Sequence, residues 1–343
     1  MPRHGFTSRA LRLSLSLAFT LLCAHAAEAA KQTFVASGGD DAGACDRPAP
    51  CRTFAGALMK TDNGGEVAVV NSGEYGTFAV NQSVRVTAVG VYAGVTAYND
   101  VAVKLNPSAG ATVALRGLTI TGGASSQGIL FYGPTVAREG EPTATLHVED
   151  CTLSGFSTVG LLFYGNGDLY VKDTTVRGTQ GAGLEVYTPQ GQKSRVSVVN
   201  TRLEKNGWGL RAFGYGHISV TARDTVAAGN GNVGFASYGS PGVRMRLQDC
   251  VSTHSGLGLW VADGARASVE GCLLTDNEAG IHANDLGEVR LSDTTVTDNE
   301  VGIKNVISNN QGTYGNVITF GNNRVNGNGQ NVVGKPSVDA LPY

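Results

Sequence analysis

Four ionisable residues occupy the same place in a recurring glycine motif. Each lies two residues after a glycine, and they are Glu185, Arg211, His282 and Lys304. Histidine is the most frequent general base near neutral pH, a carboxyl group exchanges protons, and arginine or lysine binds carboxylates. Such a set could remove a proton from a carbon next to a carboxylate. The alternative is a row of charged side chains on a solvated surface, and residue types alone leave both readings open.

Aromatic residues recur at a second place relative to the same glycines. Five of them are the fourth residue after the glycine, and Trp260 lies in the column of the ionisable residues; the five are Tyr132, Tyr164, Tyr187, Phe213 and Tyr238. Strand side chains alternate between faces, so both columns are expected to point outward. An exposed aromatic surface commonly marks a contact site, and sugar rings stack on aromatic rings. Alternatively, aromatic pairs across strands only stabilise the sheet.

Acidic residues cluster in two similar turns. Asp276-Asn277-Glu278 and Asp298-Asn299-Glu300 are separated by one repeat, which brings four carboxylates together: Asp276, Glu278, Asp298 and Glu300. Calcium prefers clustered oxygen ligands, so a weak calcium site is one reading. Asp and Asn are also common turn residues, which explains the same sequence without a metal.

A repeat organises these residues. It consists of a short strand, an anchor residue, a small residue, a second short strand, a turn and then the glycine motif, and the anchors are Gly117, Asp150, Asp173, Asn200, Asp224, Asp249, Gly271, Asp293 and Asn322. The shortest spacing, 22 residues from Asp249 to Gly271 and again to Asp293, predicts the length of one coil. One repeat cannot bury its own apolar face, so stacked coils of three strands and three turns are expected, as in a solenoid.

Three interior columns follow from this register. The residue after the glycine is large and apolar, namely Ile129, Leu161, Leu184, Leu210, Phe235, Leu259, Ile281 and Ile303. The residue after the anchor is small, namely Cys151, Thr174, Thr201, Thr225, Cys250, Cys272 and Thr294. The third column is Ile120, Leu153, Val176, Leu203, Ala227, Leu274 and Val296. Anchors of Asp, Asn or Gly suit sharp corners because they tolerate left-handed backbone angles.

The first 29 residues are typical of a secretory signal peptide. Three arginines precede an apolar run from Leu13 to Ala24, and small residues follow around Ala27. No later segment is apolar for about 20 residues, so we expect no membrane span. The formal net charge of −2 offers no footprint for nucleic acid. An exported chain with 48 glycines and 41% apolar residues fits an all-β fold.

Export would also allow a disulfide to form. Cys45 and Cys51 bracket a short loop with two prolines, and we expect them to be bonded. Cys250 and Cys272 fall in one column, where in-register parallel geometry suits a disulfide poorly, so two buried thiols are expected.

The coils resemble those of a known superfamily. Val148-Glu149-Asp150-Cys151-Thr152-Leu153, Val269-Glu270-Gly271-Cys272-Leu273-Leu274 and Thr275-Asp276-Asn277-Glu278-Ala279-Gly280-Ile281 are similar to coils of pectate-lyase-like, right-handed parallel β-helix proteins. The segment from Phe34 to Leu58 is similar to the start of many exported bacterial β-helix proteins of unassigned function. The resemblance covers nearly all of the chain after residue 29. It implies an all-β solenoid with a capping helix at about Thr53 to Lys60.

What the resemblance implies about activity is less specific. The superfamily's usual working surface lies over one strand of each coil, which favours contact with an extracellular polysaccharide along the aromatic column. A polysaccharide lyase, hydrolase or epimerase using the four ionisable residues is the alternative, and a structural or adhesive surface protein is a third. The sequence departs from the motifs of well-described enzymes: Gly216-His217-Ile218 ends without the second glycine of Gly-His-Gly, and Asn-Thr-Asp does not occur.

The expected organisation is a signal peptide, 1–29, followed by a single β-helix domain, 30–343. Within that domain, residues 30–66 are expected to form the N-terminal cap, 67–327 the coils and 328–343 a C-terminal cap or tail. Loops concentrated on one edge of a repeat scaffold commonly mark its binding side. Here the longest ones follow the glycine-motif strand, at Gly133 to Pro142, Thr188 to Ser194, Gly239 to Gly242 and Ile307 to Gly315.

Overall fold

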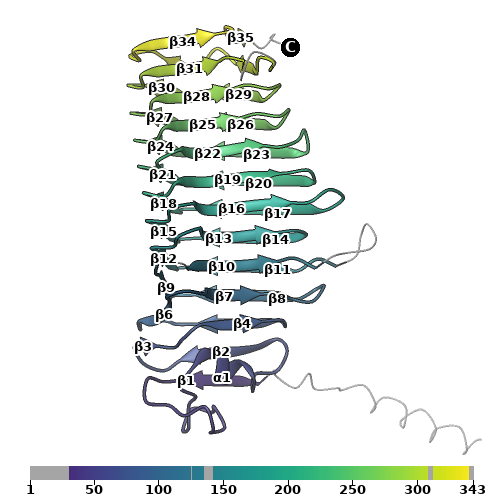
Figure 1. Ribbon diagram of the computed structural model, residues 1–343, viewed down its shortest axis with the longest axis vertical. Helices are drawn as coiled ribbons and strands as arrows, with labels where there is room; N and C mark the ends of the chain where they lie inside the picture. The colour runs from purple at the N-terminus through teal and green to yellow at the C-terminus, as the bar shows by residue number, and fades with distance from the viewer. Residues whose placement is uncertain (1–30, 125, 135–141, 308–311, 340–343) are drawn as a thin grey trace, which may run out of the picture.

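The chain is a stack of coils in which every coil contributes one strand to each of three parallel sheets. The computed structural model describes residues 31–124, 126–134, 142–307 and 312–339, so the expected signal peptide lies outside the described residues. From β2 onward, strands three apart in chain order pair with each other, while β1 pairs with β2. The sheets contain 13, 11 and 11 strands. Figure 1 shows the resulting elongated rod, with the coils rising in chain order from β1 to β35.

We name the three sheets A, B and C. Sheet A contains β1 (Gln32–Val35), β2 (Gly65–Val69), β5 (Val84–Thr87), β8 (Thr112–Arg116), β11 (Thr145–Glu149), β14 (Gly167–Lys172), β17 (Lys193–Val199), β20 (His217–Arg223), β23 (Val243–Gln248), β26 (Arg266–Glu270), β29 (Glu288–Ser292), β32 (Asn316–Thr319) and β35 (Val338–Asp339). Sheet B contains β3 (Gly73–Glu74), β6 (Ala93–Ala97), β9 (Leu118–Gly122), β12 (Thr152–Ser154), β15 (Thr175–Arg177), β18 (Arg202–Glu204), β21 (Val226–Ala228), β24 (Val251–Thr253), β27 (Leu273–Thr275), β30 (Thr295–Thr297) and β33 (Arg324–Val325). Sheet C contains β4 (Phe78–Val80), β7 (Val101–Leu105), β10 (Gln127–Tyr132), β13 (Val159–Tyr164), β16 (Ala182–Thr188), β19 (Trp208–Gly214), β22 (Val233–Tyr238), β25 (Leu257–Val261), β28 (Ala279–Ala283), β31 (Val301–Asn305) and β34 (Gln330–Gly334).

The stack has about 10 turns of about 25 residues each. This is longer than the 22-residue coil that the closest anchors predicted. The difference lies in the turns, because a coil of the predicted length suffices only where every connection is short. The segment from Thr188 to Lys193, for example, adds a turn with Pro189 and Gly191 between sheets C and A.

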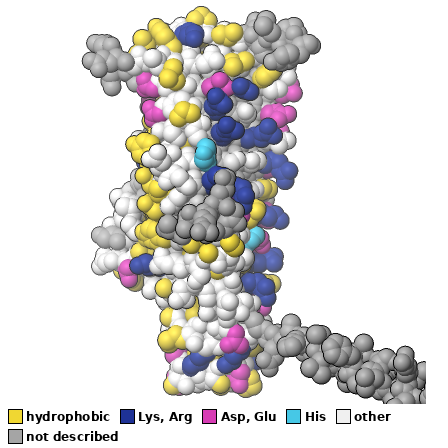
Figure 2. Space-filling model, turned by 90° about the vertical axis from the view of Figure 1, so that its right-hand side faces the viewer, with side chains coloured by type: hydrophobic (Ala, Val, Ile, Leu, Met, Phe, Trp, Pro, Cys, Tyr) yellow, Lys and Arg dark blue, Asp and Glu magenta, His cyan; other side chains and the backbone are white. Residues whose placement is uncertain are grey.

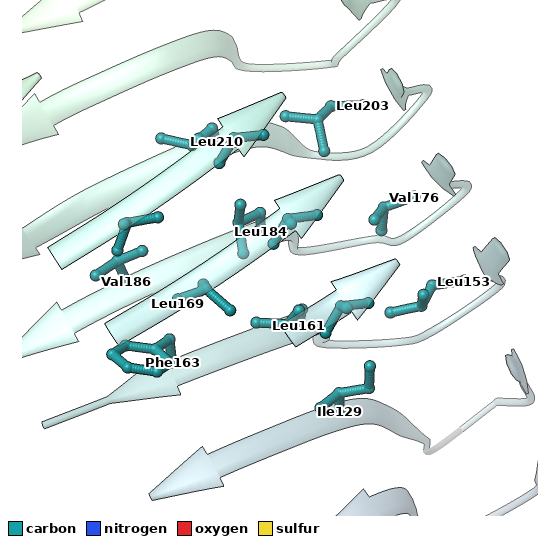
Figure 3. Close-up of a cluster of buried hydrophobic side chains, with 14 of the residues drawn as sticks. Ile129, Leu153, Leu161, Phe163, Leu169, Val176, Leu184, Val186, Leu203 and Leu210 are labelled. Atoms are coloured by element: carbon teal, nitrogen blue, oxygen red, sulfur yellow. The ribbon is translucent and has the colours of Figure 1, made fainter. Parts of the chain in front are cut away.

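The interior columns have the predicted register. Leu161, Leu184 and Leu210 are direct neighbours on β13, β16 and β19. Leu153, Val176 and Leu203 are neighbours in the same way on sheet B, and all six are buried. Figure 3 shows these side chains pointing into the space that the coils enclose. The column with Cys151 and Thr174 is also buried. Stacked like side chains therefore form one continuous core.

The anchors form the corners between sheets A and B. Asp150, Asp173 and Asp224 have φ of 53°, 49° and 50°, which is the left-handed region expected for this turn. Asn322 is an exception, since Gly321 takes the positive φ, 81°, in the last corner. The predicted anchor is thus one residue too late in that coil.

A column of buried polar side chains, which the sequence interpretation missed, runs along the turns between sheets B and C. We call it the amide column; its members are Asn206, Asn230, Ser255, Asn277, Asn299 and Asn328. In each step a side-chain oxygen accepts a hydrogen bond from the backbone N–H of the residue one coil before. The column thus accepts hydrogen bonds from turn N–H groups that the sheets leave unpaired. Buried backbone N–H groups need such partners.

The predicted capping helix is shorter than expected. Helix α1 spans Phe54–Leu58, a single turn, with Thr53 as its N-cap. Phe54 packs against Tyr75 and Phe78 with ring centroids 5.2 and 5.1 Å apart, so the helix is anchored on the first coil. Beyond Leu58 the carbonyl of Ala57 accepts from the backbone N–H of Lys60 at 3.0 Å and from the hydroxyl of Thr61 at 2.8 Å, so the chain leaves the α-helix in a tighter turn. A capping helix from Thr53 to Lys60 is therefore wrong in length.

The cysteines are as expected. Cys45 and Cys51 form a disulfide beside α1. Cys151, Cys250 and Cys272 are buried free thiols, and the backbone N–H of Cys250 donates to Sγ of Cys272 at 3.3 Å. Burial raises the pKa of the Cys151 thiol to about 12, so it is an inert core group.

Residues 328–339, expected to form a cap or tail, contribute two further strands. β34 pairs with β31 and β35 pairs with β32, both parallel. Among the described residues, no helix is long and apolar enough to cross a membrane.

Candidate functional site

Sheet C carries both outward columns that the sequence predicted. Tyr132 to Tyr238 pair in unbroken register across five strands. The column of ionisable residues is equally regular, with Glu185 beside Arg211, Trp260 beside His282, and His282 beside Lys304. The structure therefore brings together residues that lie one coil apart in the sequence, as the repeat requires.

The five outward aromatic side chains contact one another in succession. Ring centroids are 5.7 Å apart for Tyr132 and Tyr164, 5.3 Å for Tyr164 and Tyr187, 5.0 Å for Tyr187 and Phe213, and 5.2 Å for Phe213 and Tyr238. Tyr132 and Tyr164 are each 37% exposed, and the other three are half-buried. Each ring thus keeps part of its surface in solvent while packing against its neighbours.

Two tryptophans extend this row. Trp260 reaches Tyr238 with a centroid distance of 4.7 Å, although it belongs to the other column. Trp208 lies 5.8 Å from Trp260 and 6.4 Å from Tyr238. The sequence interpretation missed Trp208, which directly precedes Gly209, because it predicted no outward column at the residue before the glycine. We call the seven residues the aromatic stripe, comprising Tyr132, Tyr164, Tyr187, Phe213, Tyr238, Trp260 and Trp208.

Glu185 and Arg211 form an ion pair next to the aromatic stripe. Their side chains are only 16% and 24% exposed, so solvent screens the pair less than a surface salt bridge. The guanidinium also lies over the rings of Trp208 and Phe213, 5.2 and 4.8 Å from their centroids. Burial raises the pKa of the neighbouring Tyr238 hydroxyl, which keeps it protonated. Because the carboxylate and the guanidinium neutralise each other, the pair is suited to positioning neighbouring groups rather than to reacting.

His282 is the most perturbed ionisable residue of the site. Its Nε2 atom is buried without a hydrogen-bond partner among the described residues. Burial lowers the pKa of His282 to about 4, and the positive charge of Lys304 on the next strand contributes to this lowering, against an opposing effect of Asp285. The imidazole is therefore neutral at pH 7, as a general base must be.

The shifted pKa of His282 predicts a pH-dependent stability. The unfolded chain takes up a proton near pH 6.5, whereas the folded chain does so only near pH 4. The contribution of His282 to the free energy of unfolding is therefore fully present above about pH 6.5 and is lost as the pH drops towards about 4. After allowance for solvent screening, this loss is about 2 kcal/mol. Urea unfolding of the wild type and His282→Gln between pH 7.5 and 4 measures this loss. A variant that loses as much stability as the wild type over this range would contradict it.

The connections from sheet C to sheet A border the aromatic stripe. Tyr132, Tyr164 and Tyr238 are the last residues of β10, β13 and β22, directly before these connections. The predicted long loops at 188–194 and 239–242 lie along this edge, on the side of the rod that faces the viewer in Figure 2. Much of the other two, 135–141 and 308–311, lies outside the described residues.

Two of the four acidic residues in the two similar turns occupy special backbone positions. Asp276 and Asp298 have φ of 56° and 57°, so they occupy turn positions that favour Asp. Asn277 and Asn299, between the acids, belong to the amide column. Within the described ranges, no group of three or more His, Cys, Asp or Glu side chains is arranged to hold a metal ion. Turn geometry therefore accounts for Asp276 and Asp298, whereas Glu278 and Glu300 are exposed.

Comparisons with known proteins identify the fold. The right-handed β-helix region model matches residues 192–335. XylC in complex with xylose is 10% identical, with a TM-score of 0.52, 87% of this chain covered and 70% of that chain. A pectate lyase (13% identical; 89% and 78% covered) and the A-module of an Azotobacter vinelandii mannuronan C-5 epimerase (14% identical; 81% and 91% covered) each give a TM-score of 0.49. No curated protein matches the sequence. The chain has the right-handed parallel β-helix fold.

Proposed function

We propose that the protein is exported and binds an extracellular polysaccharide along the aromatic stripe. The observation that carries the proposal is the unbroken outward row of five aromatic side chains on consecutive strands, extended by two tryptophans. Strands about 4.8 Å apart give the five-residue row a length of about 20 Å along the rod. An elongated ligand with repeating apolar faces fits such a row, and a sugar chain is one.

Other features of the molecule support this proposal. Tyrosine hydroxyls and the Trp208 ring nitrogen add polar groups to an apolar surface, which suits sugars with both C–H faces and hydroxyls. The ring nitrogen of Trp260 is used within the protein, because it donates to Asn284 at 2.9 Å. XylC, whose solved structure contains xylose, shares the fold. The disulfide is consistent with an oxidising compartment outside the cytoplasm. Export by the leader, residues 1–29, belongs to the same proposal.

Binding to a glycan array, followed by titration calorimetry on the best ligand, tests the proposal. We expect Tyr164→Ala with Tyr187→Ala to weaken binding at least about 10-fold, which is about 1.4 kcal/mol. Tyr98→Ala with Tyr170→Ala is the matched control, because these tyrosines are also exposed but lie outside the stripe. The control should bind like the wild type. Equal losses in both double variants, or no glycan bound by the wild type, would rule the proposal out.

A catalytic role is the second candidate, and the neutral, half-buried imidazole of His282 favours it. In a lyase or epimerase, His282 would take the proton next to a uronate carboxylate, with Lys304 binding that carboxylate. Glu185 and Arg211 would orient the sugar rather than react, because they neutralise each other. A hydrolase would need two carboxyl groups facing the sugar, and among these four residues only Glu185 supplies one. Unsaturated products that persist in His282→Ala with Lys304→Ala would exclude this assignment.

A further inference from the structure

The exposed side of sheet A carries a compact group of arginines. Six outward positions on β23, β26 and β29 form two columns in register. One column is Arg244, Arg266 and Glu288, and the other is Arg246, Ser268 and Arg290. We call these six positions the arginine grid. It lies on a different sheet from the aromatic stripe, and the function proposed above makes no use of it.

Charge in the grid is unbalanced. Glu288 accepts a hydrogen bond from Arg290 at 2.8 Å, so these two charges cancel. Arg244, Arg246 and Arg266 are exposed and have no ion pair with an acid among the described residues. Elsewhere on the same sheet, Arg195 pairs with Asp168 and Arg223 with Asp224. The grid is therefore a place where the sheet leaves guanidinium groups available.

Arg244 and Arg266 repel each other, although Arg266 also has Glu288, which is already bonded to Arg290, in register on β29. Arg244 and Arg266 lie directly opposite each other on adjacent strands, about 4.8 Å apart at the backbone. Like charges directly opposite destabilise a sheet. An anion placed between the two guanidinium groups would replace this repulsion by two attractive contacts.

A hollow between the arginines is available for such an anion. It has a volume of about 170 Å³ and is lined by Arg244, Arg266, Ser268, Glu288 and Arg290, with Met245 and Ala267 also on its wall. Serine is the smallest side chain among the six grid positions, and it lies between Arg246 and Arg290 in its column. Its hydroxyl can donate a hydrogen bond. Figure 2 shows Lys and Arg side chains gathered along one side of the rod.

We propose that the arginine grid binds sulfate or phosphate ester groups of a polysaccharide. A tetrahedral ester has three terminal oxygens, enough to accept hydrogen bonds from Arg244, Arg266 and Ser268 together, whereas one forked guanidinium satisfies a carboxylate. Arg246, two residues after Arg244 on β23, adds a third unpaired guanidinium beside this position, which suits a polymer with repeated esters over a single ion. The polysaccharide as carrier rests on the proposed function, but the anion site does not depend on the aromatic stripe.

Paired probes test the site. Dextran sulfate and a phosphorylated mannan present the esters, unmodified dextran lacks charge, and polygalacturonate presents carboxylates. We expect the wild type to bind the two ester polymers more tightly than polygalacturonate and to bind less at high salt. Arg244→Gln with Arg266→Gln should weaken ester binding at least about 10-fold. Arg195→Gln with Arg223→Gln removes the same charge from paired positions of the same sheet and should change it less than about 2-fold.

Several outcomes would overturn the proposal, and they differ from failure of the proposed function. Equal losses in the two arginine variants would mean that general charge attracts the polymers. If polygalacturonate binds as tightly as dextran sulfate, the site has no preference for esters over carboxylates. If inorganic sulfate binds as tightly as the polymers, the ligand need not be a polysaccharide. Loss of binding to uncharged glycans in Tyr164→Ala with Tyr187→Ala reports on the stripe, whereas loss of the preference for ester polymers in Arg244→Gln with Arg266→Gln reports on the grid, so the two failures are distinguishable.

Discussion

Replacing Asn277 by leucine is expected to lower the free energy of unfolding by about 3 to 4 kcal/mol, because several buried groups lose their partners at once. The side-chain amide donates to the carbonyls of Ser252 and Thr275 at 3.1 and 2.9 Å. Its oxygen accepts from the backbone N–H of Ser255 at 3.0 Å. Leucine has a similar volume but satisfies none of these bonds. Urea unfolding followed by circular dichroism measures the loss.

Asn232→Leu is the control for this substitution. Asn232 lies in an equivalent turn but is exposed, so its replacement should change stability by less than about 0.5 kcal/mol. If the two variants lose similar amounts, the amide column does not stabilise the coils through these hydrogen bonds.

Arg211→Met is expected to destabilise the protein by about 2 kcal/mol, since it leaves the carboxylate of Glu185 largely buried and without its partner. The contacts of the guanidinium with the rings of Trp208 and Phe213 are lost as well. Adding Glu185→Gln should restore part of the stability, because the amide carries no charge to desolvate. Chemical unfolding of both single variants and the double variant measures the coupling.

An exposed ion pair supplies the comparison. Arg202 pairs with Glu204 on β18, and the Arg202 side chain is 59% exposed. Arg202→Met should therefore cost less than about 1 kcal/mol. If the coupling energy between Glu185 and Arg211 is no larger than that between Arg202 and Glu204, burial does not strengthen the Glu185–Arg211 pair.

The sequence predicted which residues pair between neighbouring strands, because the repeated motif identifies equivalent positions in successive coils. The glycine before Leu161 and Leu184 identifies equivalent residues in successive coils, and side-chain alternation then separates inward from outward columns. The length of a coil was less predictable, because the shortest spacing measures a coil without its longer turns. The end of helix α1 was less predictable, because the chain leaves the helix through a tight turn in which Lys60 and Thr61 both bond to the carbonyl of Ala57.

The sequence predicted which residues of the candidate site line up in columns, but not which side chains touch each other. Side-chain alternation placed Glu185 beside Arg211 and Trp260 beside His282. It gave no indication that Trp260 would cross to Tyr238, because such a contact depends on rotamers. A signal for the amide column did exist: Asn206, Asn277 and Asn299 each lie three residues before a motif glycine. The sequence interpretation considered turn chemistry and a weak calcium site for the segments around Asn277 and Asn299, and it did not connect these asparagines into a column.

The arginine grid has only a weak signal in the sequence. The patterns Arg-x-Arg, Arg-x-Ser and Glu-x-Arg begin at residues 244, 266 and 288, one coil apart each time. They become a surface only when strands of sheet A are placed side by side. Charge counts over the whole chain hide this, because the net charge of −2 averages over all faces.

The one-coil-per-rise stacking also insulates distant parts of the rod from each other. A coil contacts chiefly the coil before and the coil after it, so a substitution on β10 has no direct route to β29. Whole rungs can therefore be altered, lengthened or decorated one at a time while the remainder keeps its shape. In this chain the aromatic rungs on β10, β13 and β16 lie before the first arginine rung, β23, so that part of the stripe is free to diverge independently of the arginine grid under selection.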